Sequence, residues 1–128
     1  MAAGKYSFAI EQGTTVQFEI QYKDSANNPI NLSGYTARMQ IRPDYADNTA
    51  TTIVNLTTTL DADGTGLSMS GSNGTTPIQS GSIGIYISAA SSSAFNFNEA
   101  RYDLEIVSGN TVSRILEGCV KLRKEVTR

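Results

Sequence analysis

Histidine and tryptophan are both absent from the 128 residues of this chain, and Cys119 is its only cysteine. Without histidine, neither a Ser-His-Asp nor a Cys-His catalytic arrangement can form, and most zinc and iron sites lose a usual ligand. One cysteine cannot form an intrachain disulfide, which favours synthesis in a reducing cytosol, and we expect Cys119 to be an inert strand thiol. The sequence therefore predicts no catalytic residue, no cofactor and no metal site, and we expect that the protein is not an enzyme.

The chain is also poor in charge and in long apolar runs. Charged residues make up 17% of the sequence, and the formal net charge is −2. The densest basic cluster, Lys121 to Lys124 followed by Arg128, is typical of a solvated last strand rather than of a phosphate-binding patch. No apolar run approaches the roughly 20 residues that span a bilayer, and the N-terminal residues lack the apolar core of a signal peptide. We therefore expect no nucleic acid and no membrane as a partner.

Apolar residues instead recur at every second position along much of the chain. The alternation runs from Val16 to Tyr22, from Tyr35 to Ile41, from Ile83 to Ile87 and from Tyr102 to Ile106. A period of two places the apolar residues on one face of a β-strand. With Tyr6 to Ile10 included, about eight short strands are separated by turn-rich segments. The sequence predicts an all-β fold, an immunoglobulin-like antiparallel β-sandwich of about 7–8 strands, as one domain over residues 1–128.

In such a sandwich the apolar face of each strand packs against the opposite sheet. We expect less than about 15% helix, because the alternation leaves little room for a helical period. The side chains predicted to be largely buried are Phe18, Ile20, Met39, Ile41, Ile85, Ile87, Leu104, Ile106, Leu116 and Val120.

Turn residues mark the connections between the predicted strands. Gly109 and Asn110 predict a two-residue hairpin turn, and Asp61 to Gly64 predicts another turn. Ser88 to Ala94 is the one helix-favouring segment, with Ser88 as its cap, and we expect a short crossover between the sheets there. Gly71 to Ser80 is rich in Gly, Ser, Asn and Thr and is predicted to be a mobile loop.

Two acidic pairs are candidates for a metal or catalytic site. Asp61 to Gly64 resembles the start of a calcium loop, but the acids that such a loop needs further on are replaced by Thr65 and Ser72. Asp103 and Glu105 share one face of a strand, as the carboxylates of a glycosidase share a cleft. Because the chain has no tryptophan to line a sugar cleft, a solvated strand face is the better interpretation.

Aromatic residues are the remaining candidates for ligand binding. The dry faces of the predicted strands accommodate Tyr22, Tyr35 and Tyr102, but Tyr86 lies opposite the isoleucines of its strand. Without tryptophan, Phe95, Phe97 and Tyr86 are the residues that could form a platform for a sugar ring.

Several short segments of the chain form a recognisable order. They are Ile10–Thr15, Lys23–Ser25, Pro29–Arg42, Ile87–Ala90, Tyr102–Glu105 and Arg114–Gly118. Together, over most of the chain, they resemble a family of small tailed-bacteriophage virion structural proteins, and the arrangement is similar to the N-terminal domain of phage upper baseplate proteins. The resemblance carries no catalytic signature.

The resemblance implies a virion structural protein of the tail, baseplate or fibre-attachment region, made in the host cytoplasm and acting by protein–protein assembly. Its partners would be other phage structural proteins and further copies of itself, with a trimer favoured. Exposed strand edges would make the contacts, and Thr51 to Thr58 and Gly71 to Ser80 are the first candidates. Two alternatives are a capsid decoration (cement) protein and a carbohydrate-binding module that recognises a host glycan.

Overall fold

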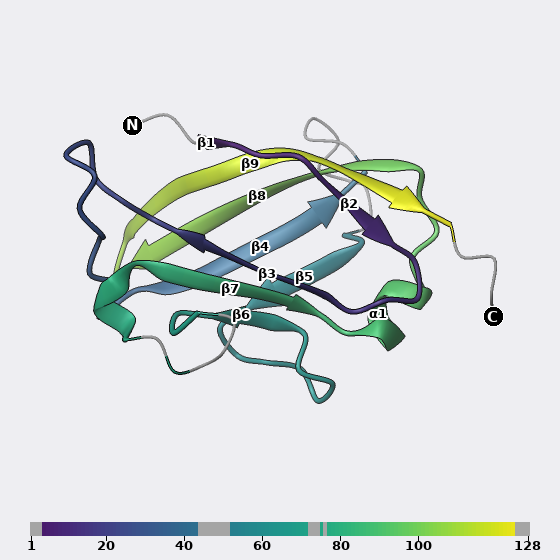
Figure 1. The fold of residues 1–128 in the computed structure, drawn as a ribbon, viewed down its shortest axis with the longest axis horizontal. Coiled ribbons are helices and arrows are strands. Elements are labelled where there is room, and N and C mark those ends of the chain that lie inside the picture. The colour runs from purple at the N-terminus through teal and green to yellow at the C-terminus, as the bar shows by residue number, and fades with distance from the viewer. Residues whose placement is uncertain (1–3, 44–51, 72–74, 76, 125–128) are drawn as a thin grey trace.

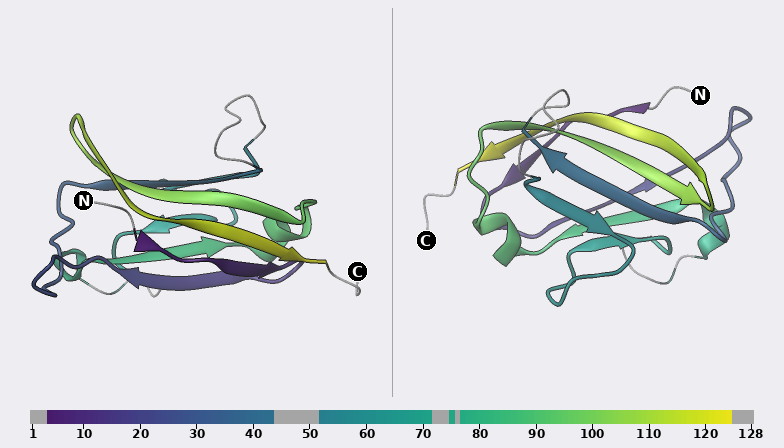
Figure 2. Two further views of the ribbon diagram at one scale, coloured as in Figure 1. Left: turned by 90° about the horizontal axis from the view of Figure 1, so that it is seen from above. Right: turned by 180° about the vertical axis from the view of Figure 1, so that it is seen from behind.

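The computed structural model describes residues 4–43, 52–71, 75 and 77–124, and these residues form two stacked sheets (Figures 1 and 2). Besides the strands, this described part of the chain contains one short helix, α1 (Ala89–Ser93), and a 3-10 turn (Ile78–Ser80). The strands are β1 (Gly4–Lys5), β2 (Phe8–Glu11), β3 (Val16–Gln21), β4 (Thr36–Arg42), β5 (Val54–Thr57), β6 (Gly66–Ser68), β7 (Ser82–Ile87), β8 (Glu99–Ser108) and β9 (Thr111–Arg123).

The fold is an all-β sandwich, as predicted. The larger sheet has the order β9-β8-β4-β5, with β1 and β2 both paired to the outer side of β9, and the smaller sheet has the order β3-β7-β6. Figure 2 shows the two sheets lying one above the other. This strand order is compatible with an immunoglobulin-like arrangement, in which a C-F-G sheet faces a B-E-D sheet. The finer immunoglobulin-like assignment stays a prediction.

One edge departs from the predicted antiparallel pairing. Of the expected first strand, Tyr6 to Ile10, only the part from Phe8 onward is in a strand, β2, while Tyr6 and Ser7 form a break after the short strand β1. Both β1 and β2 run parallel to β9. The reason is that the next strand, β3, belongs to the other sheet, so the N-terminal segment pairs with the last strand of the chain instead. The other strand pairings are antiparallel.

The core lies between the sheets and follows the predicted alternation. Seven of the ten predicted residues are buried: Met39, Ile41, Ile85, Ile87, Leu104, Ile106 and Val120. Phe18, Ile20 and Leu116 are instead partly buried and pack against this core. Phe18 and Ile20 lie on β3, which is at the edge of the smaller sheet, and Leu116 lies next to a register shift between β8 and β9. Edge and bulge positions leave one side of these side chains uncovered.

Aromatic rings close the side of the sandwich between β2 and β3. The ring of Phe8 packs against Phe18 and Tyr102, with centroids 5.0 and 5.1 Å apart. The Tyr102 hydroxyl donates to the Tyr6 carbonyl at 2.6 Å, so a buried side chain of β8 fixes the break between β1 and β2.

The predicted turns are present. Gly109, with a φ of +58°, and Asn110 join β8 to β9 in a two-residue hairpin. Ser88 caps α1 by accepting a hydrogen bond from the Ser91 N–H at 3.0 Å. Within Gly71 to Ser80, predicted as a mobile loop, residues 72–74 and 76 lie outside the described residues, and the 3-10 turn forms the end of the segment.

Gly118 of β9 permits the close approach of the N-terminal segment. A Cβ at this position would overlap the Tyr6 carbonyl, whose carbon would lie 2.7 Å away. We expect Gly118→Ala to lower the free energy of unfolding by about 1–3 kcal/mol, because the backbone there must move. Urea unfolding followed by circular dichroism measures this change.

Gly4→Ala is the matched control. A Cβ there would make ordinary contacts at 3.6 Å, so its effect should stay within about 0.5 kcal/mol. Equal effects of the two substitutions would contradict a steric role for Gly118.

Candidate functional site

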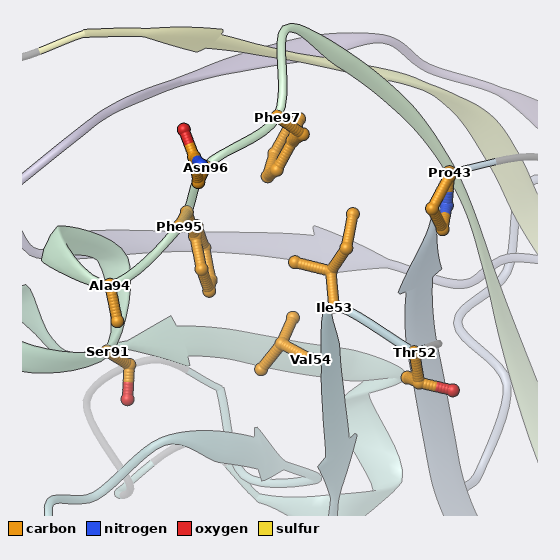
Figure 3. Close-up of a pocket in the computed structure, with 9 residues that line it drawn as sticks. All are labelled: Pro43, Thr52, Ile53, Val54, Ser91, Ala94, Phe95, Asn96 and Phe97. Carbon is orange, nitrogen blue, oxygen red and sulfur yellow. The ribbon is translucent and has the colours of Figure 1, made fainter. Parts of the chain in front are cut away.

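An apolar hollow of about 540 Å³ lies where the start of β5 faces the segment that follows α1 (Figure 3). Pro43 at the end of β4 also lines it, and none of the nine lining residues is charged. Figure 3 shows the side chains of Ile53, Phe95 and Phe97 directed toward the same space. A concave, uncharged lining of this kind suits an apolar group.

Two phenylalanines form one wall of this hollow. The rings of Phe95 and Phe97 lie with centroids 5.8 Å apart, Phe95 buried and Phe97 half-buried. The backbone that carries them is fixed, because the Phe95 N–H donates to the Ser92 carbonyl at 3.1 Å and the Gln12 side chain donates to the Phe95 carbonyl at 2.8 Å. This side of the hollow is therefore preformed in the chain by itself.

A polar cluster behind α1 holds this wall in place. Asp63 accepts hydrogen bonds from the Ser88 and Ser91 hydroxyls at 2.5 and 2.8 Å and from the Thr65 N–H at 3.0 Å. These donors, the Ser88 hydroxyl foremost, hold the pKa of the Asp63 carboxyl far below its ordinary value. The carboxylate thus ties the turn before β6 to the crossover helix.

The buried Ser92 makes a second tie, on the other side of α1. Its hydroxyl donates to the Thr14 carbonyl at 2.7 Å and accepts from the Gly13 N–H at 3.1 Å. Gly13 has a φ of +84°, which favours glycine at this turn between β2 and β3. Three segments far apart in the sequence therefore meet at one end of the sandwich.

Strand β5 forms one edge of the larger sheet, next to the hollow. Among the described strands it pairs with β4 alone, and its four residues carry no charge. An edge without charge is open to strand addition. The predicted contact region, Thr51 to Thr58, is therefore at an edge, although Thr51 itself lies outside the described residues.

The structure brings Ile53 and Val54 to Phe95 and Phe97, which the sequence analysis treated as separate candidates. Tyr86, the third aromatic candidate, does not join them. It lies on the outer face of the smaller sheet, in a second hollow. No local pattern predicts the meeting of Ile53 with Phe97, because the two residues are about forty positions apart in the sequence and come together only in the folded chain.

The acidic residues of β8 lie on the outer face of the larger sheet and are paired individually. Glu105 contacts Arg38 at 2.8 Å, and Asp103 contacts Arg114 at 3.4 Å. Burial raises the pKa of the Asp103 carboxyl, while the neighbouring Arg114 acts in the opposite direction. This is the charged strand face that the alternation predicts, and no aromatic side chain lines the hollow above it.

Cys119 lies on the outer face of β9, opposite the buried Val120. The Arg101 guanidinium donates to its sulfur, and its own N–H donates to the Ser7 hydroxyl at 3.2 Å. Lys124, from the basic cluster, donates to the Asn96 side chain at 2.9 Å. Cys119 therefore makes its contacts beside the N-terminal segment, and Lys124 makes its contact beside the residues that precede β8.

Within the described ranges, no three His, Cys, Asp or Glu side chains gather closely enough to hold a metal ion. No helix in the described part of the chain has the length and apolar character to cross a bilayer.

No protein-family model and no curated protein matches the chain.

The hydrogen bonds to Asp63 make part of the stability depend on pH. Because they favour the ionised carboxylate, their contribution is present above the ordinary pKa of 3.8 and is lost as the pH falls through the lower pKa of the folded state. We expect Asp63→Asn to lower the midpoint of thermal unfolding at pH 7, and the difference from wild type to shrink below about pH 4.

Asp61→Asn, in the same turn, is the control, since the Asp61 main-chain groups make the hydrogen bonds that shape the turn. Differential scanning calorimetry at several pH values measures both variants. A difference for Asp63→Asn that stays constant down to the lowest pH would contradict a role for the ionised carboxylate.

Proposed function

We propose that this domain is a structural protein of a tailed-bacteriophage virion, in the tail, baseplate or fibre-attachment region, made in the host cytoplasm. Its role is protein–protein assembly, without an enzymatic step. The resemblance of its segments to phage structural proteins supports the virion assignment. The observation that carries the assembly role is the apolar hollow beside the uncharged edge strand β5.

The assembly contact combines two kinds of recognition. An added strand would pair its main chain with β5, which gives affinity, and an apolar side chain of the same segment would enter the hollow, which gives specificity. The uncharged lining favours an apolar group over an ionised one, because a charge would lose its hydration there without a counter-charge. Phe95 and Phe97 supply a fixed aromatic surface. The few residues that contribute most of the binding energy of an interface commonly pack into pockets of this kind.

The occupant that we propose is a neighbouring copy of this chain. Virion proteins work in many copies around symmetry axes, and cyclic homo-oligomers are the common solution. A trimer is the state that the resemblance favours. Other phage structural proteins would then attach to this ring.

Mass spectrometry of purified particles, and of separated heads and tails, tests the virion assignment. Enrichment in tails supports the proposal, whereas enrichment in heads supports a capsid decoration protein instead. Absence from the particles would refute both.

Ile53→Asp tests the contact. Ile53 is partly exposed at the mouth of the hollow, so a carboxylate there should weaken self-association by about tenfold or more without unfolding the domain. Light scattering across a concentration series measures the association, and circular dichroism checks the fold.

Val112→Asp is the matched control. It makes the same chemical change at an exposed position of the β8–β9 hairpin, on a residue that does not line the hollow. Equal weakening in both variants would place the contact elsewhere, and a monomeric wild-type protein would remove self-association from the proposal.

A further inference from the structure

A second hollow, of about 360 Å³, lies over the outer face of the smaller sheet. Tyr86 of β7 is its aromatic residue, and the register places Tyr86 between Gly66 of β6 and Gln17 of β3. The neighbouring row on the same face holds Ser68 and Gly84. Glu19 of β3 completes that row, so the small residues of this face lie on β6 and β7, next to the Tyr86 ring.

The position of the Tyr86 ring is set by its neighbours. A Cβ on Gly64 would lie 3.4 Å from the ring, so the glycine lets the turn before β6 lie against its edge. Leu60, a residue that is 54% exposed, adds a second apolar surface to the hollow. The hollow therefore offers two apolar surfaces that are open to solvent.

Hydrogen-bonding groups are placed around these surfaces. Gln17 contributes an amide, Ser68 a hydroxyl and Asp63 a carboxylate, all within the lining of the same hollow. Asp63 is held in place by Ser88 and Ser91, and at neutral pH its side chain is an ionised carboxylate that accepts hydrogen bonds. A carboxylate has more acceptor sites than these bonds occupy.

This set of groups selects a class of ligand. Among the described lining residues there is no cation, which disfavours phosphate and other anions, and the single carboxylate disfavours an acidic partner. A lipid chain would cover the Asp63 carboxylate and the Gln17 amide without offering either of them a hydrogen bond. A sugar ring presents apolar C–H faces and a rim of hydroxyls that both donate and accept, which matches an aromatic ring flanked by an amide, a hydroxyl and a carboxylate. The volume lies in the range of small-ligand pockets.

We propose that the hollow around Tyr86 binds a neutral saccharide unit, with the sugar ring stacked on Tyr86 and its hydroxyls bonded to Gln17 and Asp63. This site is separate from the hollow beside β5, which contains Phe95 and Phe97. The proposal does not rest on the virion assignment or on self-association.

The test is a titration of the isotope-labelled protein followed by two-dimensional amide NMR. The probes are glucose, galactose, rhamnose and N-acetylglucosamine, each added to about 50 mM, because a single sugar ring on one aromatic residue is expected to bind in the millimolar range. At least one of these sugars should shift the amide signals of Gly64, Gly66 and Gly84 in a saturable way. No saturable shift with any of them would overturn the proposal.

Substitutions identify the site. Tyr86→Ala should abolish the shifts, and Tyr86→Phe, which keeps the ring, should retain most of them. Gln17→Ala, at an exposed edge-strand position, should weaken binding several-fold and gives a second measurement if Tyr86→Ala does not fold. Tyr6→Ala is the control, since this exposed tyrosine belongs to the aromatic group between β2 and β3.

The outcomes separate this site from the other proposal. Shifts that survive Tyr86→Ala, or that centre on Phe97, would refute a Tyr86 site and favour a platform in the other hollow. Because the titration is read on the isolated protein, it can succeed or fail independently of the particle fractions and the light scattering.

Discussion

The hydrogen bonds from Ser88 and Ser91 to Asp63 hold the two hollows in position relative to one another. Ser91 lines the hollow beside β5, and Asp63 lines the hollow around Tyr86. The bond between them, at 2.8 Å, therefore joins the two candidate surfaces through a single contact. The crossover helix is only five residues long, too short to be stable by itself, so these bonds and those of Ser92 decide where the segment carrying Phe95 lies.

Much of the fold could be predicted because its causes are local. The alternation from Val16 to Tyr22 predicted a strand with one dry face, and the Gly109-Asn110 pair predicted the hairpin turn. The cap at Ser88 could be predicted for the same reason, since a serine before small residues accepts the first free N–H of a helix.

The rest depended on contacts between distant segments. The parallel pairing of β2 with β9 follows from the sheet to which β3 belongs. The alternation of apolar and polar residues does not show to which sheet a strand belongs. Of the candidate sites, the sequence indicated Tyr86, Phe97 and the uncharged edge, but not the hollows that contain them. Those hollows exist because Ile53, just before β5, lies near the segment that follows α1, and because Gly66 lies opposite Tyr86 while Gly84 precedes it by two residues on β7.

The two edges of the larger sheet differ in a way that bears on assembly. The β1–β2 edge is interrupted at Tyr6 and Ser7 and carries Lys5 and Glu11, which pair with Glu117 and Arg123 of β9. A broken, charged edge resists the addition of another strand, because a partner would have to match the break and desolvate the charges. Within the described residues, strand β5 has neither a break nor a charge, and it lies beside an apolar hollow. If copies of this chain meet edge to edge, the physical asymmetry of the sheet therefore directs the contact to β5, and the charged N-terminal edge is left facing solvent.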